Sequence, residues 1–144
     1  YEISNFGKPG YFSKNNSSYW LGKKYIGLGP SAHSYDGVSR SWNVANNSLY
    51  LKEIASGFRE FETEELSRND RYNEYIMTGL RTIWGVSLNR ITIDFGTDYK
   101  NRLLGDASRM IASGLLELKN DVISTTPKGK FLADGIASEL FITD

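Results

Sequence analysis

The sequence predicts a protein of the α+β class in two parts, and two observations support this prediction. Residues 1–46 are dense in glycine, serine, asparagine and aromatic residues, a composition typical of short strands joined by loops. From Ser67 onward, apolar residues recur about every 3.6 positions, which is the period of an amphipathic helix. We therefore expect strands in the first part and a helical domain in the second.

The first part is expected to contain a strand over residues 1–6 and a second strand over residues 25–29. Residues 47–48 can cap a short helix, with Gly57 at its C-terminal end. The apolar side of this helix would consist of Tyr50, Leu51 and Ile54. The acidic run over residues 60–65 is expected to be a linker.

The second part is expected to begin with three helices. Ser67 and Asp70 fit a capping box for the first, and Gly85 can end it. The second helix would cover residues 88–93, and the third would end at Gly114. The predicted apolar stripes are Tyr72, Ile76, Leu80 and Ile83 on the first helix, and Tyr99, Leu103, Ala107, Met110 and Ile111 on the third.

A hairpin and a last helix are predicted to complete this part. Asn120 and Asp121 tolerate the positive φ of a tight turn between strands at residues 115–118 and 122–124. Thr126 and Pro127 can start a helix that buries Phe131, Leu132, Ile136 and Leu140. This order of elements is typical of a winged-helix-like domain, so we predict one domain over residues 1–60 and another over residues 61–144.

Composition excludes several kinds of site. Seventeen basic and seventeen acidic residues give no net charge to attract nucleic acid or anionic lipid. The absence of cysteine excludes disulfides, thiolate metal sites and a cysteine-bound iron–sulfur cluster in this chain. No segment has the roughly 20 apolar residues of a membrane span, and we expect a cytoplasmic protein. Since the chain begins with a strand-like run and no Met, we also expect it to be a piece of a longer protein.

The segment at residues 25–37 is the best candidate for chemistry. Here the predicted second strand ends in small residues around the single histidine, His33. Gly27 and Gly29 permit a close approach to backbone that a Cβ would block. We therefore expect a cofactor to bind at Gly27, Gly29, Ser31, Ala32 and His33. Glu2, Asp36 and Arg40 are weaker acid–base candidates, because no spacing brings them together.

Several motifs resemble a known family. They are residues 1–6 with Lys8-Pro9-Gly10, then Asn16-x-x-Tyr19-Trp20, then residues 25–34, Arg40-x-Trp42-Asn43 and residues 73–81. Together they resemble, in order and over essentially the whole chain, the oxygen-independent coproporphyrinogen III oxidase-like radical SAM family, in particular its HemW branch. His33 favours that branch, because the oxidases have an aliphatic residue at the matching place.

The resemblance implies a longer parent with a radical SAM barrel, S-adenosylmethionine and a [4Fe–4S] cluster bound by three cysteines, and with haem or a porphyrin as ligand. Residues 1–60 would then be the end of the barrel with a connecting helix, and residues 61–144 the family's C-terminal domain, packed on the parent's N-terminal barrel. We expect no cofactor and no catalysis in the present chain alone. Whether the parent is an enzyme stays open between a haem chaperone and a true oxidase.

The resemblance also implies haem or porphyrin contacts at His33, Asn16, Tyr19 and Trp20. Asn15 stands where the family has histidine, and an amide is a poor iron ligand. For Trp20, packing in the core is an alternative role, and for His33 a role in shaping the pocket is the alternative.

A DNA-binding or protein-interaction module of winged-helix type is a further alternative. The predicted third helix has the mixed charges of Asp98, Lys100, Arg102, Asp106 and Arg109, without the basic excess that phosphate contacts need. We therefore expect no nucleic-acid partner.

Overall fold

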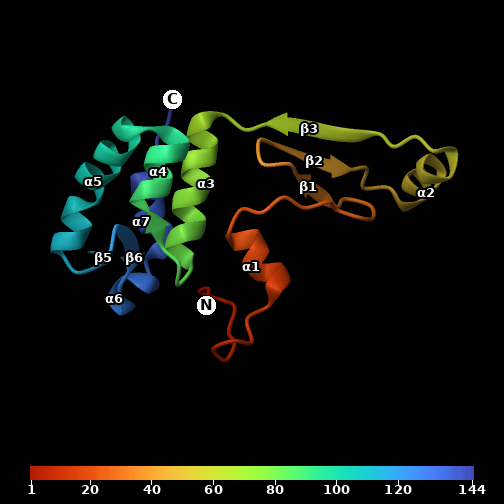
Figure 1. Ribbon diagram of the computed structural model, residues 1–144. Coiled ribbons are helices and arrows are strands. Elements are labelled where there is room, and N and C mark those ends of the chain that lie inside the picture. The colour runs from red at the N-terminus through yellow and green to blue at the C-terminus, as the bar shows by residue number, and fades with distance from the viewer. The chain divides into compact units, whose positions relative to one another are not determined.

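The computed structural model describes residues 1–144 and divides them into two compact units. Tyr1–Leu21 and Arg68–Asp144 form the first, called the terminal unit here, and Gly22–Ser67 form the second, called the middle unit. Each unit combines helices with a small antiparallel sheet, so the predicted α+β class is confirmed (Figure 1). The N-terminal 21 residues, expected to group with the first part of the chain, instead belong to the same compact unit as the C-terminal helices.

The terminal unit contains six helices around a three-stranded sheet of order β4-β6-β5. The strands are β4 (Val86–Ser87), β5 (Leu116–Lys119) and β6 (Val122–Thr125). The helices are α1 (Lys14–Trp20), α3 (Arg68–Arg81), α4 (Leu88–Phe95), α5 (Thr97–Ala112), α6 (Pro127–Lys130) and α7 (Ala133–Leu140). No helix of either unit has the length and apolar content that crossing a membrane requires.

The core of the terminal unit is formed by the predicted apolar stripes. Tyr72, Ile76 and Leu80 of α3 are fully buried, as are Leu103 and Ala107 of α5. The exception is Ile83, which was expected to extend the α3 stripe and is 56% exposed. It lies beyond the end of α3, in the turn where Gly85 (φ 66°) redirects the chain into β4.

The predicted hairpin is confirmed, with φ of 49° at Asn120 and 65° at Asp121 between β5 and β6. The predicted last helix is wrong in one respect, because it is broken into α6 and α7. As predicted, Thr126 caps α6 by accepting a hydrogen bond from the Gly129 amide (3.1 Å).

The break follows from how α6 is held. A Cβ at Gly129 would lie 1.9 Å from the carbonyl oxygen of Leu115, so α6 lies directly on the chain that enters β5. The chain then changes direction at Phe131 and Leu132 before α7 packs against α3. Phe131 is therefore 94% exposed and Leu132 is 54% exposed, although the sequence pattern predicted both in the core.

The middle unit contains a sheet of order β1-β2-β3 and the helix α2 (Asn47–Ser56). Its strands are β1 (His33–Tyr35), β2 (Ser39–Asn43) and β3 (Phe61–Glu65). The prediction that residues 60–65 form a linker is wrong, because residues 61–65 pair with the whole of β2. Main-chain pairing, and not side-chain burial, explains this strand, since all five of its side chains are exposed.

The helix α2 begins and ends close to the predicted positions. Its N-cap is Asn46, one residue before the predicted cap, and Gly57 ends it with a φ of 74°. The predicted apolar side is not buried: Leu51 is 67% exposed and Ile54 is 50% exposed. Glu53 is instead the buried residue of this helix, with its carboxylate accepting a hydrogen bond from the Glu60 amide (3.3 Å).

Candidate functional site

The glycine segment of the middle unit forms a loop and not the predicted strand. Only Tyr25 pairs, with Tyr35, as an isolated bridge. The Gly27 amide donates to the Ser34 hydroxyl (2.9 Å), and the Gly29 amide donates to the Tyr50 hydroxyl (3.1 Å). Side chains therefore replace a neighbouring strand as hydrogen-bond partners of this segment.

Asn43 holds the same loop from β2. This residue is buried, and its side-chain amide donates to the carbonyl oxygens of Gly29 (2.8 Å) and Gly27 (3.3 Å). Its own backbone amide donates to the carbonyl of Ala32 (3.0 Å). Since one side chain ties both glycines to the sheet, we identify Asn43 as a residue that orders the loop and that motif reasoning did not assign to it.

The two glycines meet different requirements. A Cβ at Gly27 would lie 2.2 Å from the His33 carbonyl oxygen, so the missing side chain makes room for the chain's own backbone. Gly29 has a φ of 106° and faces open space. Ser31 adopts a positive φ of 59°, and its amide donates to the Val44 carbonyl (3.0 Å). An external group can therefore approach the loop at Gly29 but not at Gly27.

His33 lies at the start of β1 with an exposed side chain. Its cross-strand partner is Trp42, whose ring centroid is 5.7 Å from the imidazole centroid. The aromatic neighbour orients the imidazole while leaving it accessible. This geometry permits His33 to bind an external ligand.

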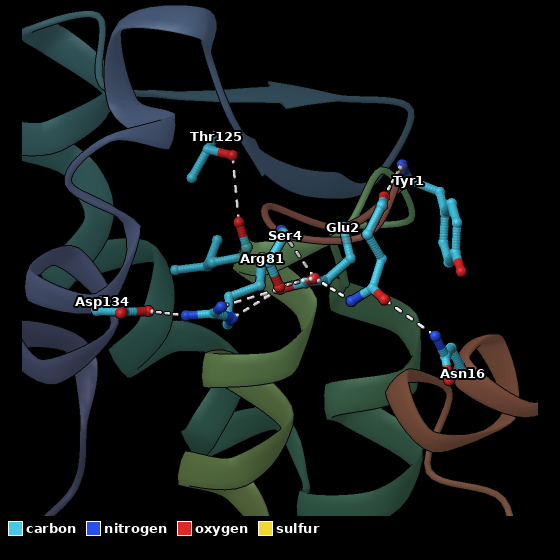
Figure 2. Close-up of polar contacts among 9 residues, drawn as sticks. Tyr1, Glu2, Ser4, Asn16, Arg81, Thr125 and Asp134 are labelled. Carbon is cyan, nitrogen blue, oxygen red and sulfur yellow. Dashed lines mark hydrogen bonds and ion pairs between the residues drawn. The ribbon is translucent and has the colours of Figure 1, made fainter. Parts of the chain in front are cut away.

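A second candidate lies in the terminal unit, around the buried carboxylate of Glu2 (Figure 2). One oxygen of Glu2 accepts from the Ser4 amide (2.9 Å), the Ser4 hydroxyl (2.8 Å) and the Asn5 side-chain amide. The other oxygen accepts a hydrogen bond from Nε of Arg81 (3.0 Å) and forms an ion pair with Nη2 of the same residue (3.0 Å). Burial alone would raise the pKa of Glu2, but the hydrogen bonds from Asn5, Ser4 and Arg81 lower it below its ordinary value.

The same contacts explain why residues 1–6 are not the predicted strand. Glu2 and Asn5 exchange backbone hydrogen bonds of 3.2 and 3.1 Å, which closes a turn. The turn is attached to the end of α3 by the Ile3 amide, which donates to the Arg81 carbonyl (3.0 Å). The Ser-Asn pair inside the turn favours such a conformation over an extended strand.

Arg81 links this turn to α7. Its Nη1 donates to Asp134 at 2.7 Å, while Nε and Nη2 bind Glu2. The hydrogen bond to Asp134 raises the pKa of Arg81, and the bond to Glu2 adds to this effect against the opposing effect of burial. Arg81 therefore stays charged and joins two carboxylates from opposite ends of the chain.

Two of the predicted ligand-contacting residues join this cluster. The side-chain amide of Asn16 donates to the Asn5 side-chain oxygen (2.9 Å), and the Trp20 ring lies 5.7 Å from the Arg81 guanidinium. Tyr19 is 53% exposed and Asn15 is exposed. We call Glu2, Asn5, Asn16, Arg81 and Asp134 the Glu2 cluster.

Motif reasoning missed Asn5, Arg81 and Asp134 as members of a site. Asn5 and Arg81 both lie inside recognised motif segments, at residues 1–6 and 73–81. Arg81 pairs with Glu2, 79 residues earlier, and with Asp134, 53 residues later, so no local pattern could reveal these pairs. Of the three acid–base candidates, Glu2 belongs to this cluster, whereas Asp36 and Arg40 lie in the middle unit.

The residues of this chain do not fit an iron–sulfur cluster. The sequence has no cysteine, and nowhere do three or more His, Cys, Asp or Glu side chains gather as a metal-binding group. The middle unit offers the accessible imidazole of His33, and the terminal unit offers the Glu2 cluster beside the indole ring of Trp20. These groups can bind and orient a ligand.

Comparison with known proteins gives consistent results. Residues 66–132 match the model of the HemN C-terminal domain. A heme chaperone HemW of Bacillus subtilis is 33% identical over 94% of this chain and 36% of its own length. A heme chaperone HemW of Mycobacterium tuberculosis is 32% identical over 97% of this chain and 34% of its own length. The chain thus spans about a third of the length of these relatives.

Among solved structures, the coproporphyrinogen III oxidase HemN of Escherichia coli, a radical SAM enzyme, matches with a TM-score of 0.62. The match covers 83% of this chain and 28% of that protein, at 20% sequence identity. This likeness concerns the fold.

Proposed function

Because the chain belongs to the HemN and HemW family, as a C-terminal part of HemW-like proteins, we propose that it serves a radical SAM protein of haem or porphyrin metabolism. The observation that supports this most is the similarity to two heme chaperones over nearly all of the chain. Within this family, the identity to those chaperones exceeds the 20% identity to the oxidase HemN. We therefore favour a haem chaperone over a coproporphyrinogen oxidase.

In this proposal the present chain contributes binding and positioning. The cluster and S-adenosylmethionine of a radical SAM parent would supply its redox chemistry. Because residues 1–144 contain no cysteine, the parent would have to bind the cluster through other residues. The loop at Gly29, Ser31, Ala32 and His33 would face the cofactor or the haem. In the terminal unit, the Glu2 cluster would hold Asn16 and Trp20 in place to contact a ligand.

The finer description of the fold and the location also belongs to the proposal. The order α3, α4, α5 and the β5–β6 hairpin supports a winged-helix-like domain over residues 61–144. Residues 1–60 would complete the parent's barrel and contact its N-terminal part. We place the protein in the cytoplasm.

A DNA-binding function has less support. Two of the three cations on α5 are engaged with acids: Arg102 with Asp106 at 3.6 Å, and Arg109 with Glu139 at 3.0 Å. A helix whose cations are neutralised in this way gains little from phosphate contacts. We therefore retain the haem proposal.

Titration of haemin into the 144-residue chain, followed at the Soret band, tests the proposal. The sequence alone predicted no cofactor for this chain, but the exposed imidazole of His33 leads us to expect saturable binding of haemin. The spectrum should shift and binding should weaken after His33→Ala, because an axial imidazole is lost. Asn15→Ala is the matched control and should leave both unchanged. Absence of saturable binding by the wild-type chain would contradict the proposed function, whereas an unaltered spectrum in the His33 variant would remove only His33 from the site.

A further inference from the structure

A groove of about 1000 Å³ lies on the terminal unit, beside the Glu2 cluster. Met110, Leu115 and Ile136 line it together with two segments of very exposed apolar residues. One segment contributes Phe6, and the other contributes Phe131 and Leu132. The volume is at the upper end of the range of small-molecule sites, which is about 300–1000 Å³.

The exposure of the two aromatic rings needs an explanation. Phe6 is 86% exposed and Phe131 is 94% exposed, although both line the groove. Phe131 lies in the bend between α6 and α7, and Phe6 directly follows the turn that Glu2 and Asn5 close. A concentration of exposed rings at a hollow is typical of a binding surface and suits a flat apolar ligand.

One cation of the groove is free to meet an anionic group. Arg81 and Arg109 line the groove, but both are paired with carboxylates: Arg81 with Glu2 and Asp134, and Arg109 with Glu139. Lys130 also lines the groove, and its ammonium group forms no ion pair. One unpaired ammonium group beside two exposed phenyl rings is complementary to a flat apolar molecule that bears carboxylates.

We propose that this groove binds the ring of a porphyrin carboxylate by its apolar faces and its acid groups, independently of the central metal. The groove has no histidine or cysteine, and the thioether of Met110 belongs to a residue only 6% exposed, so no ordinary iron ligand is available there. This site is distinct from the iron-binding role proposed for His33. The inference rests on the proposed function, because that function supplies the porphyrin.

Metal-free protoporphyrin IX is the probe that tests the groove, with fluorescence anisotropy as the readout and haemin as competitor. We expect the Phe6→Ala, Phe131→Ala double variant to bind about tenfold more weakly or worse, since two ring contacts are lost. Lys130→Glu should weaken binding several-fold, with an effect that shrinks at high salt. All three side chains are exposed, so folding should survive, which circular dichroism checks.

Matched controls come from the same unit. Ile93→Ala removes an apolar side chain that is 74% exposed on α4, and Lys100→Glu reverses a charge on α5; neither residue lines the groove. Both should bind the porphyrin as the wild type does. Equal losses in the controls and in the groove variants would overturn the proposal.

The possible outcomes distinguish failure of the groove proposal from failure of the proposed haem function. If wild type binds haemin but not the metal-free porphyrin, or if the groove variants keep full affinity, the groove proposal is wrong and the haem function stands. If the chain binds neither molecule, both fail. If the double variant instead abolishes self-association of the chain with porphyrin binding intact, the groove is a contact between copies and the porphyrin proposal is overturned.

Discussion

Replacing Glu2 by glutamine should destabilise the terminal unit strongly. The Glu2 side chain is fully buried, and its two oxygens accept four hydrogen bonds, one from Nε of Arg81 and three from Ser4 and Asn5. Nη2 of Arg81 adds an ion pair. Glutamine offers one oxygen and an NH₂ group, so in either orientation a donor faces other donors. The substitution therefore removes the negative charge and leaves buried donors without acceptors.

The size of the stability loss depends on the partners that Arg81 keeps after the substitution. Breaking a buried ion pair by removing one partner costs about 3–5 kcal/mol. Here Arg81 keeps Asp134 as a partner and its side chain is 22% exposed, so part of its charge stays solvated or paired. We expect a loss of about 2–4 kcal/mol in the free energy of unfolding of the terminal unit, as expected for several charge-assisted hydrogen bonds.

Urea unfolding measures this effect if the fluorescence reports one unit. Trp20 and Trp84 lie in the terminal unit and Trp42 lies in the middle unit, so a Trp42→Phe background isolates the relevant signal. Glu139→Gln is the control, because its partner Arg109 has an 83% exposed side chain, and such pairs contribute below about 1 kcal/mol. If Glu2→Gln costs no more than Glu139→Gln, the reasoning about the buried carboxylate is refuted.

The pH dependence gives an independent check with a definite sign. The folded state lowers the pKa of Glu2, so its stabilisation is fully present above the ordinary value of 4.5 and is lost as the pH falls through the lowered pKa. Wild type should therefore lose more stability in acid than Glu2→Gln does. Parallel stability curves for the two proteins below pH 4.5 would contradict the linkage.

Three other predictions use different parts of the fold. Gly129→Ala should cost about 1–3 kcal/mol in thermal unfolding, because its Cβ would overlap the Leu115 carbonyl, whereas Gly105→Ala on open α5 should gain up to about 1 kcal/mol. Tyr72→Phe should stabilise the chain by about 1 kcal/mol in urea, since the buried hydroxyl has no partner; ultraviolet titration should show the burial-raised pKa of about 12. The backbone amides of Ser39 and Val38 and the Ser39 hydroxyl hold the pKa of Asp36 at about 2. Acid should therefore disorder the β1–β2 turn only near pH 2, and Asp36→Asn should remove that transition from amide NMR spectra.

Local sequence signals predicted those features of the terminal unit that depend only on neighbouring residues. The stripe of Tyr72, Ile76 and Leu80, the positive φ values at Asn120 and Asp121, and the cap at Thr126 depend on neighbouring residues, and the structure confirms them. The pattern failed for Phe131, because the backbone contact of Gly129 with Leu115 interrupts a helix whose periodicity is intact. That contact joins distant segments and leaves no local signature.

The candidate site shows the same limit. His33, Asn16 and Trp20 were recognisable from motifs, and the structure gives each a defined neighbourhood. The partnership of Glu2 with Arg81 was not predictable, since neither residue has a spacing that points to the other. The loop at Gly27 was mistaken for a strand because its partners are side chains of Ser34, Tyr50 and Asn43, which a pattern of apolar residues does not detect.

The long separation between Glu2 and Arg81 has a consequence for how the chain tolerates change. The contact closes a loop of 79 residues that contains all of the middle unit. Loop-closure entropy grows only with the logarithm of length, by about 0.6 kcal/mol for each doubling. Insertions and deletions within residues 22–67 should therefore hardly loosen the terminal unit, and a protease cut there would leave two peptides still joined through the Glu2 cluster.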